Sequence, residues 1–130
     1  MKDNVILDKT LDFSVRIVNL CKYLRKEKKE YLMSEQLLRC GTSIGANAHE
    51  AHNGQSSRDF LAKMYISFKE AAETEYWLKL LSRTNYLTQE QSKSILADCE
   101  EIKKILSAII LTLKTKMKEE KGNNAERNKK

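Results

Sequence analysis

Apolar residues recur at intervals of three and four along four stretches of the chain, with polar residues between them. This spacing places the apolar side chains on one face of an α-helix. It predicts helices over about residues 8–29, 34–52, 57–85 and 89–118. The connections are short, so consecutive helices are expected to lie antiparallel. The pattern therefore predicts an all-α protein, an up-down-up-down antiparallel four-helix bundle within residues 1–118.

The predicted helices begin at recognisable capping signals. Ser34 and Ser56 stand where N-capping side chains are needed, and Thr88 forms a capping box with Gln91 before the last helix. Residues 119–130 are polar and charged, and we expect them to form a disordered basic tail. The chain is therefore expected to hold one helical domain followed by this tail.

Two glycines lie four residues apart inside the second predicted helix, where each costs roughly 1 kcal/mol relative to alanine. Gly41, Gly45 and Ala48 share one helical face, so the backbone of another helix can approach closely there. The alternative is a glycine loop that binds phosphate. That motif needs a strand before the glycines and usually a Lys-Ser/Thr pair after them, and the sequence has neither. The stripe predicts close helix packing.

The first and third predicted helices each carry a second apolar stripe, opposite the one expected to face the core. A monomeric bundle has no use for two apolar faces on one helix, so the second stripe predicts a homo-oligomer. The alternative is a scatter of single apolar residues on the surface. The stripe consists of Leu11, Val15 and Val18 on the first helix and Ile66, Trp77 and Leu80 on the third.

The chain has a net charge of +6, and its densest basic segment closes the first predicted helix. Such a surface binds nucleic-acid phosphates by releasing counterions. The alternative is a solvated helix end, where cations favour the negative end of the helix dipole. The candidate nucleic-acid-binding residues are Lys22, Arg25, Lys26, Lys28 and Lys29.

Histidines and carboxylates do not form a recognisable metal motif. His49 and His52 lie three residues apart with Glu50 between them, whereas a zinc-protease helix needs histidines four apart. Paired Glu-x-x-His motifs of di-iron bundles are also missing. No metal, cofactor or catalytic residue is therefore predicted.

Two acidic pairs, Glu70 with Glu73 and Asp98 with Glu101, resemble the magnesium sites of helical nucleotide pyrophosphatases. Glu70 and Glu73 are expected to point away from the core and Asp98 into it, so the two pairs would not converge. Glu75 also falls on a core stripe. A buried carboxylate needs partners, so Glu75 and Asp98 predict a structural polar network rather than acid–base catalysis.

The cysteines and the hydropathy profile indicate the compartment. Cys21, Cys40 and Cys99 are odd in number and widely separated, which is typical of small buried hydrophobes in a reducing cytoplasm. No run of about 18 apolar residues is present, so no transmembrane helix is expected. The first residues lack a signal-peptide pattern. The sequence predicts a cytoplasmic protein.

Two sequence blocks carry a resemblance to a known family. On these blocks the chain resembles the 23S rRNA intervening-sequence proteins, which are small bacterial four-helix bundle proteins. The likeness covers roughly residues 5–117. The matching segments are Leu38–Asn47 with Glu50-Ala51, then Arg58–Met64, Lys69–Ala71 and Glu73–Leu78, together with Leu11–Phe13 near the start.

The resemblance implies a compact bundle that assembles into a ring, expected to be a homopentamer. Some members of the family are encoded within sequences inserted in 23S rRNA genes. A related branch is the accessory variability determinant protein of diversity-generating retroelements, a basic pentameric barrel that binds nucleic acid and its reverse transcriptase. The resemblance brings no catalytic residues to this chain. Gly41, Gly45 and Asn47 match the family's signature, and we interpret them as structural.

These observations lead to one favoured function and one alternative. We predict a non-enzymatic homo-oligomer that binds RNA or DNA through a basic surface and is associated with rRNA intervening sequences or a retroelement. The alternative is a protein-interaction scaffold, or an accessory subunit for a reverse transcriptase or a ribosomal factor. No contact with a membrane is expected.

Overall fold

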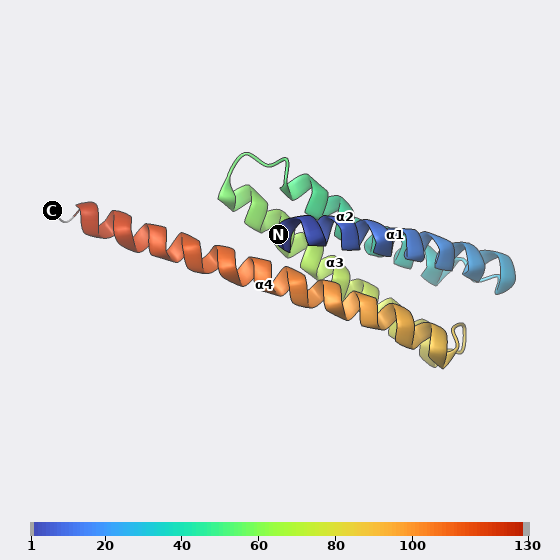
Figure 1. Cartoon of the computed structure of the whole chain (residues 1–130). Coiled ribbons are helices and arrows are strands. Elements are labelled where there is room, and N and C mark those ends of the chain that lie inside the picture. Colours follow the sequence, from blue (N-terminus) through green and yellow to red (C-terminus); the bar gives the residue numbers. More distant parts are fainter. Residues whose placement is uncertain (1, 129–130) are drawn as a thin grey trace.

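Four antiparallel helices make up the computed structural model, which describes the backbone of residues 2–128 and the side chains of residues 5–126. The helices follow one another through short turns (Figure 1). This arrangement confirms the prediction of an all-α four-helix bundle. The helices are α1 (Lys2–Glu27), α2 (Leu32–Ala51), α3 (Ser57–Arg83) and α4 (Gln89–Asn128).

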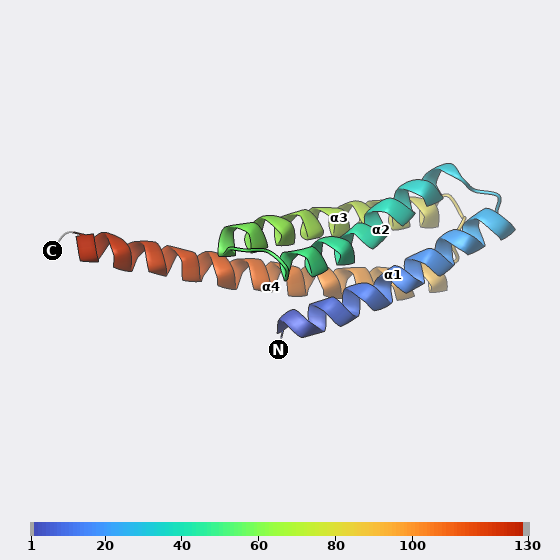
Figure 2. The same ribbon diagram turned by 90° about the horizontal axis from the view of Figure 1, so that it is seen from above.

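Each helix packs against its neighbours in sequence, and α4 closes the bundle against α1 (Figures 1 and 2). The α1–α4 contact is the least extensive of the four. Among the described residues α1 does not contact α3, so these two helices lie diagonally across the bundle. Their outward faces therefore point to opposite sides of the molecule.

The core consists of the apolar stripes that predict the helices. Burying each of these side chains contributes roughly 1.5–3 kcal/mol relative to leaving it exposed. The chain in residues 2–128 holds no helix with both the length and the apolarity needed to cross a membrane. The largest buried side chains include Phe13 and Ile17 of α1, Leu37 and Ile44 of α2, Met64 and Leu78 of α3, and Ile102 and Leu106 of α4.

The glycines of α2 lie against α1. A Cβ atom added to Gly41 would lie 2.8 Å from Cγ1 of Ile17, and one added to Gly45 would lie 3.2 Å from the backbone oxygen of Thr10. Ala48, one turn further along, is fully buried. The small residues thus allow α1 and α2 to approach more closely than larger side chains would permit.

Two of the three predicted N-caps are confirmed. Ser56 begins α3, where its side chain accepts a hydrogen bond of 3.1 Å from the backbone N–H of Asp59. Thr88 and Gln91 form the predicted capping box before α4, with reciprocal bonds of 2.9 and 3.1 Å. These bonds satisfy backbone donors that a helix start otherwise leaves unpaired.

The predicted N-cap at Ser34 is wrong, because α2 begins earlier, at Leu32, and Ser34 is buried inside it. The carboxylate of Glu30 does the capping. It accepts hydrogen bonds from the backbone N–H groups of Leu32 at 3.1 Å, Met33 at 3.0 Å and Ser34 at 2.7 Å. A carboxylate in this position also complements the positive end of the helix dipole.

The helix ends differ from the predicted ones at both termini of the chain. α1 begins at Lys2, well before residue 8, and α4 continues to Asn128 instead of ending at residue 118. Residues 119–128 of the predicted disordered tail are therefore helical, and residues 129–130 lie outside the described residues. An existing helix extends without a new nucleation cost, and Lys and Glu favour it. This part of α4 projects beyond the bundle (Figure 1).

Candidate nucleic-acid interface

The predicted basic residues lie where α1 ends and turns into α2. Lys22, Lys26, Lys28 and Lys29 are exposed to solvent, and Arg25 is half-buried. Lys29 adopts a left-handed backbone conformation with a φ of 55°. Such a residue commonly ends a helix, although for a side chain other than glycine it costs about 1–2 kcal/mol.

Arg25 differs from the four lysines because it also holds the turn together. Its Nε donates a hydrogen bond of 3.1 Å to Oγ of Ser34, and that hydroxyl donates one of 3.0 Å to the backbone oxygen of Glu30. The side chain thus links the end of α1 to the first turn of α2. Replacing Arg25 would disturb this link as well as remove a charge.

The four lysines keep their charges free of ion pairs to any carboxylate that the structure describes. In the part of the chain that the structure describes, none of them forms an ion pair, whereas cations elsewhere on the bundle do. The carboxylate of Glu30 is turned inward onto the α2 backbone and its residue is 7% exposed. Glu27 is the exposed acid of this segment. The net charge presented to solvent is therefore positive.

The fold adds two cations that the sequence pattern did not single out. The α1–α2 and α3–α4 turns lie at the same end of the bundle, away from the projecting part of α4 (Figures 1 and 2). Arg83 in the last turn of α3 and Lys93 near the start of α4 are both exposed there. We call this surface the basic end; it consists of Lys22, Lys26, Lys28, Lys29, Arg83 and Lys93, with Arg25 beneath them.

The predicted oligomer stripe is exposed in part. Leu11 is 56% exposed, Val15 55% and Ile66 40%, whereas Val18, Trp77 and Leu80 are half-buried. Because α1 and α3 are diagonal, the two halves of the stripe lie on opposite sides of the bundle. One copy therefore offers two separate apolar surfaces rather than one continuous patch.

Trp77 is held more firmly than its neighbours in the stripe. It packs against the core, and its Nε1 donates a hydrogen bond of 3.2 Å to Glu73. Arg39 pairs with the same carboxylate and with Glu70. Burial opposes ionisation of Glu73, but hydrogen bonds from Trp77 and Arg39 outweigh it, so the pKa of this carboxyl is lowered.

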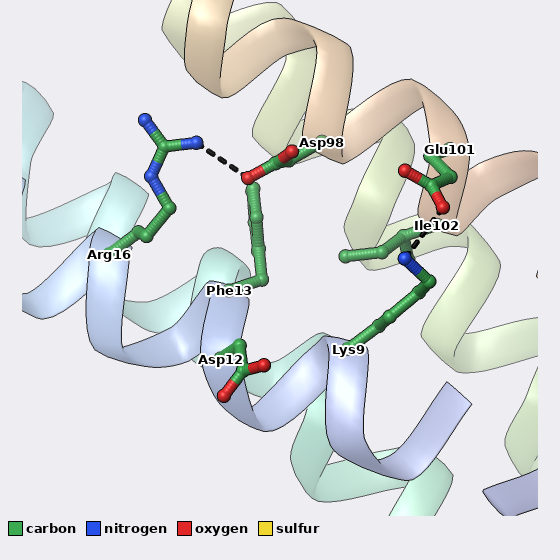
Figure 3. A pocket seen from close by; sticks show the side chains of 7 residues that line it. All are labelled: Lys9, Asp12, Phe13, Arg16, Asp98, Glu101 and Ile102. Carbon is green, nitrogen blue, oxygen red and sulfur yellow. Dashed lines mark hydrogen bonds and ion pairs between the residues drawn. The ribbon is translucent and has the colours of Figure 1, made fainter. Parts of the chain in front are cut away.

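The acidic pairs lie in separate clusters, Glu70 and Glu73 beside α2 and the other pair at the α1–α4 contact. Asp98 accepts a bond of 2.5 Å from Arg16, and Glu101 lies 2.6 Å from Lys9 (Figure 3). The expectation that Asp98 points into the core is wrong: its side chain is 46% exposed, because the α1–α4 contact is open enough to leave it at the rim.

A pocket of about 170 Å³ lies between α1 and α4. Figure 3 shows its lining side chains and the two ion pairs that join the helices across it. Phe13 and Ile102 lie among its walls, and Asp12 adds a further carboxylate. Among the described residues, no group of three or more His, Cys, Asp or Glu side chains could hold a metal ion. The charged groups at this pocket mainly pair with one another across the two helices.

Glu75 forms part of the polar network expected of it, with Lys79 as one partner. Its carboxylate lies 3.3 Å from Nζ of Lys79 and 3.5 Å from Nζ of Lys103 on α4. Burial opposes ionisation, but the hydrogen bond from Lys79 and the charges of both lysines outweigh it and lower the pKa. The pair with Lys103 ties α3 to α4.

The histidines make contacts with the backbone rather than with each other. Nε2 of His49 lies 3.3 Å from the backbone oxygen of Leu7. Nδ1 of His52 lies 2.9 Å from the backbone oxygen of Ala48, and its ring meets Phe60 edge to face. These contacts anchor the end of α2.

The three cysteines are buried and carry no disulfide. Burial raises the pKa of the Cys21 and Cys40 thiols to about 11 and that of Cys99 to about 12. A thiol with so high a pKa is a poor nucleophile at neutral pH. In this structure the three cysteines pack as small apolar side chains.

Comparison with known proteins agrees with the resemblance found in the sequence. The family model described as 23S rRNA-intervening sequence protein matches residues 2–108. A crystal structure of a protein of unknown function from the S23 ribosomal protein family of Bacteroides thetaiotaomicron VPI-5482 is 60% identical, with a TM-score of 0.84. The match covers 85% of this chain and 98% of that chain. No curated protein matches.

Proposed function

The chain belongs to the 23S rRNA-intervening sequence protein family, and from this premise we propose that it is a non-enzymatic homo-oligomer that binds RNA or DNA. The binding surface is the basic end, which contacts phosphates without strong sequence preference. The protein acts in the cytoplasm, in association with an rRNA intervening sequence or a retroelement.

The observation that carries this proposal is the exposure of six cations at one end of the bundle, with no ion pairs to them among the described residues. Each lysine or arginine that meets a phosphate releases condensed counterions, which favours binding. The relative from Bacteroides thetaiotaomicron is named as a member of a ribosomal protein family, which agrees with a partner made of RNA.

The exposed stripes support assembly of several copies. Leu11 and Val15 on one side and Ile66 on the other give two unlike surfaces. When such surfaces join head to tail, each copy is related to the next by a rotation, and a rotation that closes generates a ring. The family resemblance supports a pentamer as the size of this ring. All basic ends would then lie on one rim, and their positive potentials would add.

The test is nucleic-acid binding by the purified protein over a salt series, with the particle mass measured in the same buffer. We expect a ring-sized particle whose affinity falls steeply with salt. The variant carrying Lys22→Ala, Lys26→Ala and Lys28→Ala should bind more weakly and with a flatter salt dependence. These lysines are exposed, so their replacement leaves the fold intact.

A matched control removes the same charge elsewhere. Lys116, Lys118 and Lys121 are exposed on the projecting part of α4, at the other end of the molecule. Their triple alanine variant should bind almost as the wild type does. An equal decrease in affinity in both triple variants would mean that binding depends on net charge alone, and would contradict the assignment of binding to the basic end. No binding at low salt would contradict the function itself.

A second candidate is favoured by the same exposed stripes. They could receive a protein partner, such as a reverse transcriptase or a ribosomal factor, in place of another copy. Ile66→Glu is the sharper probe than a change at Trp77, because Trp77 also packs on the core. A monomeric wild type that binds such a partner, and loses it with Ile66→Glu, would favour the scaffold over the homo-oligomer.

A further inference from the structure

The turn between α1 and α2 exposes an aromatic ring beside the lysines. Tyr31 is 54% exposed and Leu32 is 80% exposed, and both follow Lys28 and Lys29 closely in the chain. Most of the other aromatic side chains pack at least in part against the core. An exposed aromatic beside cations is the combination that single-stranded nucleic acids bind, with bases stacked on the ring and phosphates on the charges.

Glu30 does not present its carboxylate to this surface. It lies between Lys29 and Tyr31, where an exposed carboxylate would repel a phosphate. Instead, its side chain is buried and accepts three backbone hydrogen bonds from the start of α2. The start of α2 is thereby occupied, so a phosphate would be held by the lysine side chains and not by the helix N-terminus.

The same hydrogen bonds hold the turn in place. Glu30 fixes the residues that follow Tyr31, and Arg25 ties Ser34 to the end of α1. Tyr31 itself is the N-cap residue of α2, and because this residue is 54% exposed, a ligand can reach the ring. Because hydrogen bonds already hold this turn in place, the aromatic ring loses little conformational entropy on binding.

We propose that the α1–α2 turn is a binding site for single-stranded RNA or DNA, in which an unpaired base stacks on Tyr31 and the adjoining phosphates contact Lys28 and Lys29. This inference rests on the proposed function, because it assigns the basic end a preference for unpaired strands. In a duplex the base faces are covered by stacking, so a duplex offers this turn only its phosphates.

The surroundings favour nucleic acid over a protein partner for this turn. Its apolar surface consists of two residues, Tyr31 and Leu32, and the lysines that flank it form no ion pair with any described residue. Protein interfaces instead deplete charge at their centres and place lysine less often there. The surfaces that fit that description are the stripes with Leu11, Val15 and Ile66.

The experiment compares Tyr31→Phe, Tyr31→Leu and Tyr31→Ala by fluorescence anisotropy with a labelled oligouridylate and a duplex RNA of equal length. Stacking is worth about 1–3 kcal/mol per base, so Leu and Ala should weaken binding of the single strand by roughly 5- to 150-fold. Phe keeps the ring and should bind within about twofold of the wild type. Duplex binding should change little in all three variants.

The salt dependence separates stacking from charge. The Tyr31 variants keep every cation, so their slope of log affinity against log salt should equal that of the wild type. Lys28→Ala should instead flatten the slope by about 0.7 for each phosphate that this lysine neutralises on a single strand. Tyr76→Leu is the matched control, since Tyr76 is 59% exposed on α3 outside the basic end, and it should not change binding.

The possible results distinguish failure of the stacking site from failure of the proposed nucleic-acid binding. If the wild type binds neither oligonucleotide at low salt, the proposed function fails and the inference fails with it. If it binds both, and Tyr31→Leu equals the wild type on the single strand, the function stands and the stacking site is overturned. Weaker binding of the single strand by the Leu variant but not by the Phe variant supports the site.

Discussion

Replacing Lys29 with glycine removes a charge from the basic end while leaving the turn in its preferred shape. Lys29 has a φ of 55°, in the left-handed region that glycine enters without steric cost. Alanine at this position would keep the strained backbone. Lys29→Gly is therefore the substitution at this turn that best separates the effect of charge from an effect on folding.

The effects on stability nearly cancel. Relief of the left-handed conformation is worth about 1–2 kcal/mol. Against it stand the greater freedom of glycine in the unfolded chain, about 0.4–1 kcal/mol, and the removal of a cation near the end of α1, about 0.3–1 kcal/mol. The net change in the free energy of unfolding is thus expected to be within about 1 kcal/mol of zero. The expected change in binding is a salt slope lower by about 0.7 for each phosphate that Lys29 neutralises on a single strand.

The assay is anisotropy over a salt series, with thermal unfolding of the same samples. Asn85→Gly is the matched control, because Asn85 has a φ of 67° in the α3–α4 turn at the same end of the bundle but carries no charge. It should leave binding and its salt slope unchanged. If Lys29→Gly also binds with the wild-type slope, Lys29 does not contact phosphate. If its unfolding temperature falls sharply, the reasoning about the turn is wrong.

Three further predictions concern the bundle itself. Gly41→Ala should lower the free energy of unfolding by about 1 kcal/mol, because overpacking against Ile17 outweighs the gain in helix propensity. Urea unfolding measures this change. Gly122 has open space around it, so Gly122→Ala should show no such decrease. The three buried cysteines should resist a thiol reagent in the native protein at pH 8 and react fully in denaturant. Fast labelling of these thiols in the folded protein would contradict their raised pKa values. Glu75 has a pKa below its ordinary 4.5, so its stabilisation, at most about 1 kcal/mol, is present above that pH and lost as the pH falls through the lowered value. Glu75→Gln should remove this part of the acid sensitivity, and an unchanged pH profile would contradict it.

The helical periodicity of the sequence was sufficient to predict the bundle, because each helix carries an apolar stripe long enough to form its share of the core. The ends of the helices were predicted less well, since several side chains compete to cap one start. Ser34 has the residue type of an N-cap, but the carboxylate of Glu30 accepts hydrogen bonds from the backbone N–H groups of Leu32 and Ser34, so the helix begins before Ser34. The charge of Glu30 gains more from the helix dipole than a hydroxyl does.

Asp98 shows a different limit of the sequence pattern. Its position on the α4 stripe predicts burial, and the helix does turn it toward α1. How far a side chain at the edge of a stripe is buried depends on how tightly the facing helix packs. The α1–α4 contact is the least extensive in the bundle, and Arg16 meets Asp98 at its rim. That spacing is a property of the assembled fold and is not encoded in either helix alone.

The basic end also arises from topology, and this links binding to assembly. Lys28 and Arg83 are far apart in sequence, and the up-down order of the helices brings their two turns to one end. A single bundle offers few phosphate contacts, which gives weak binding at physiological salt. In a ring, one strand can meet several copies, so each further contact becomes intramolecular and the apparent affinity rises. Val15→Glu, which changes no residue of the basic end, should therefore weaken binding of a long single strand more than that of a short one. Equal decreases in affinity for both lengths would mean that each bundle binds on its own.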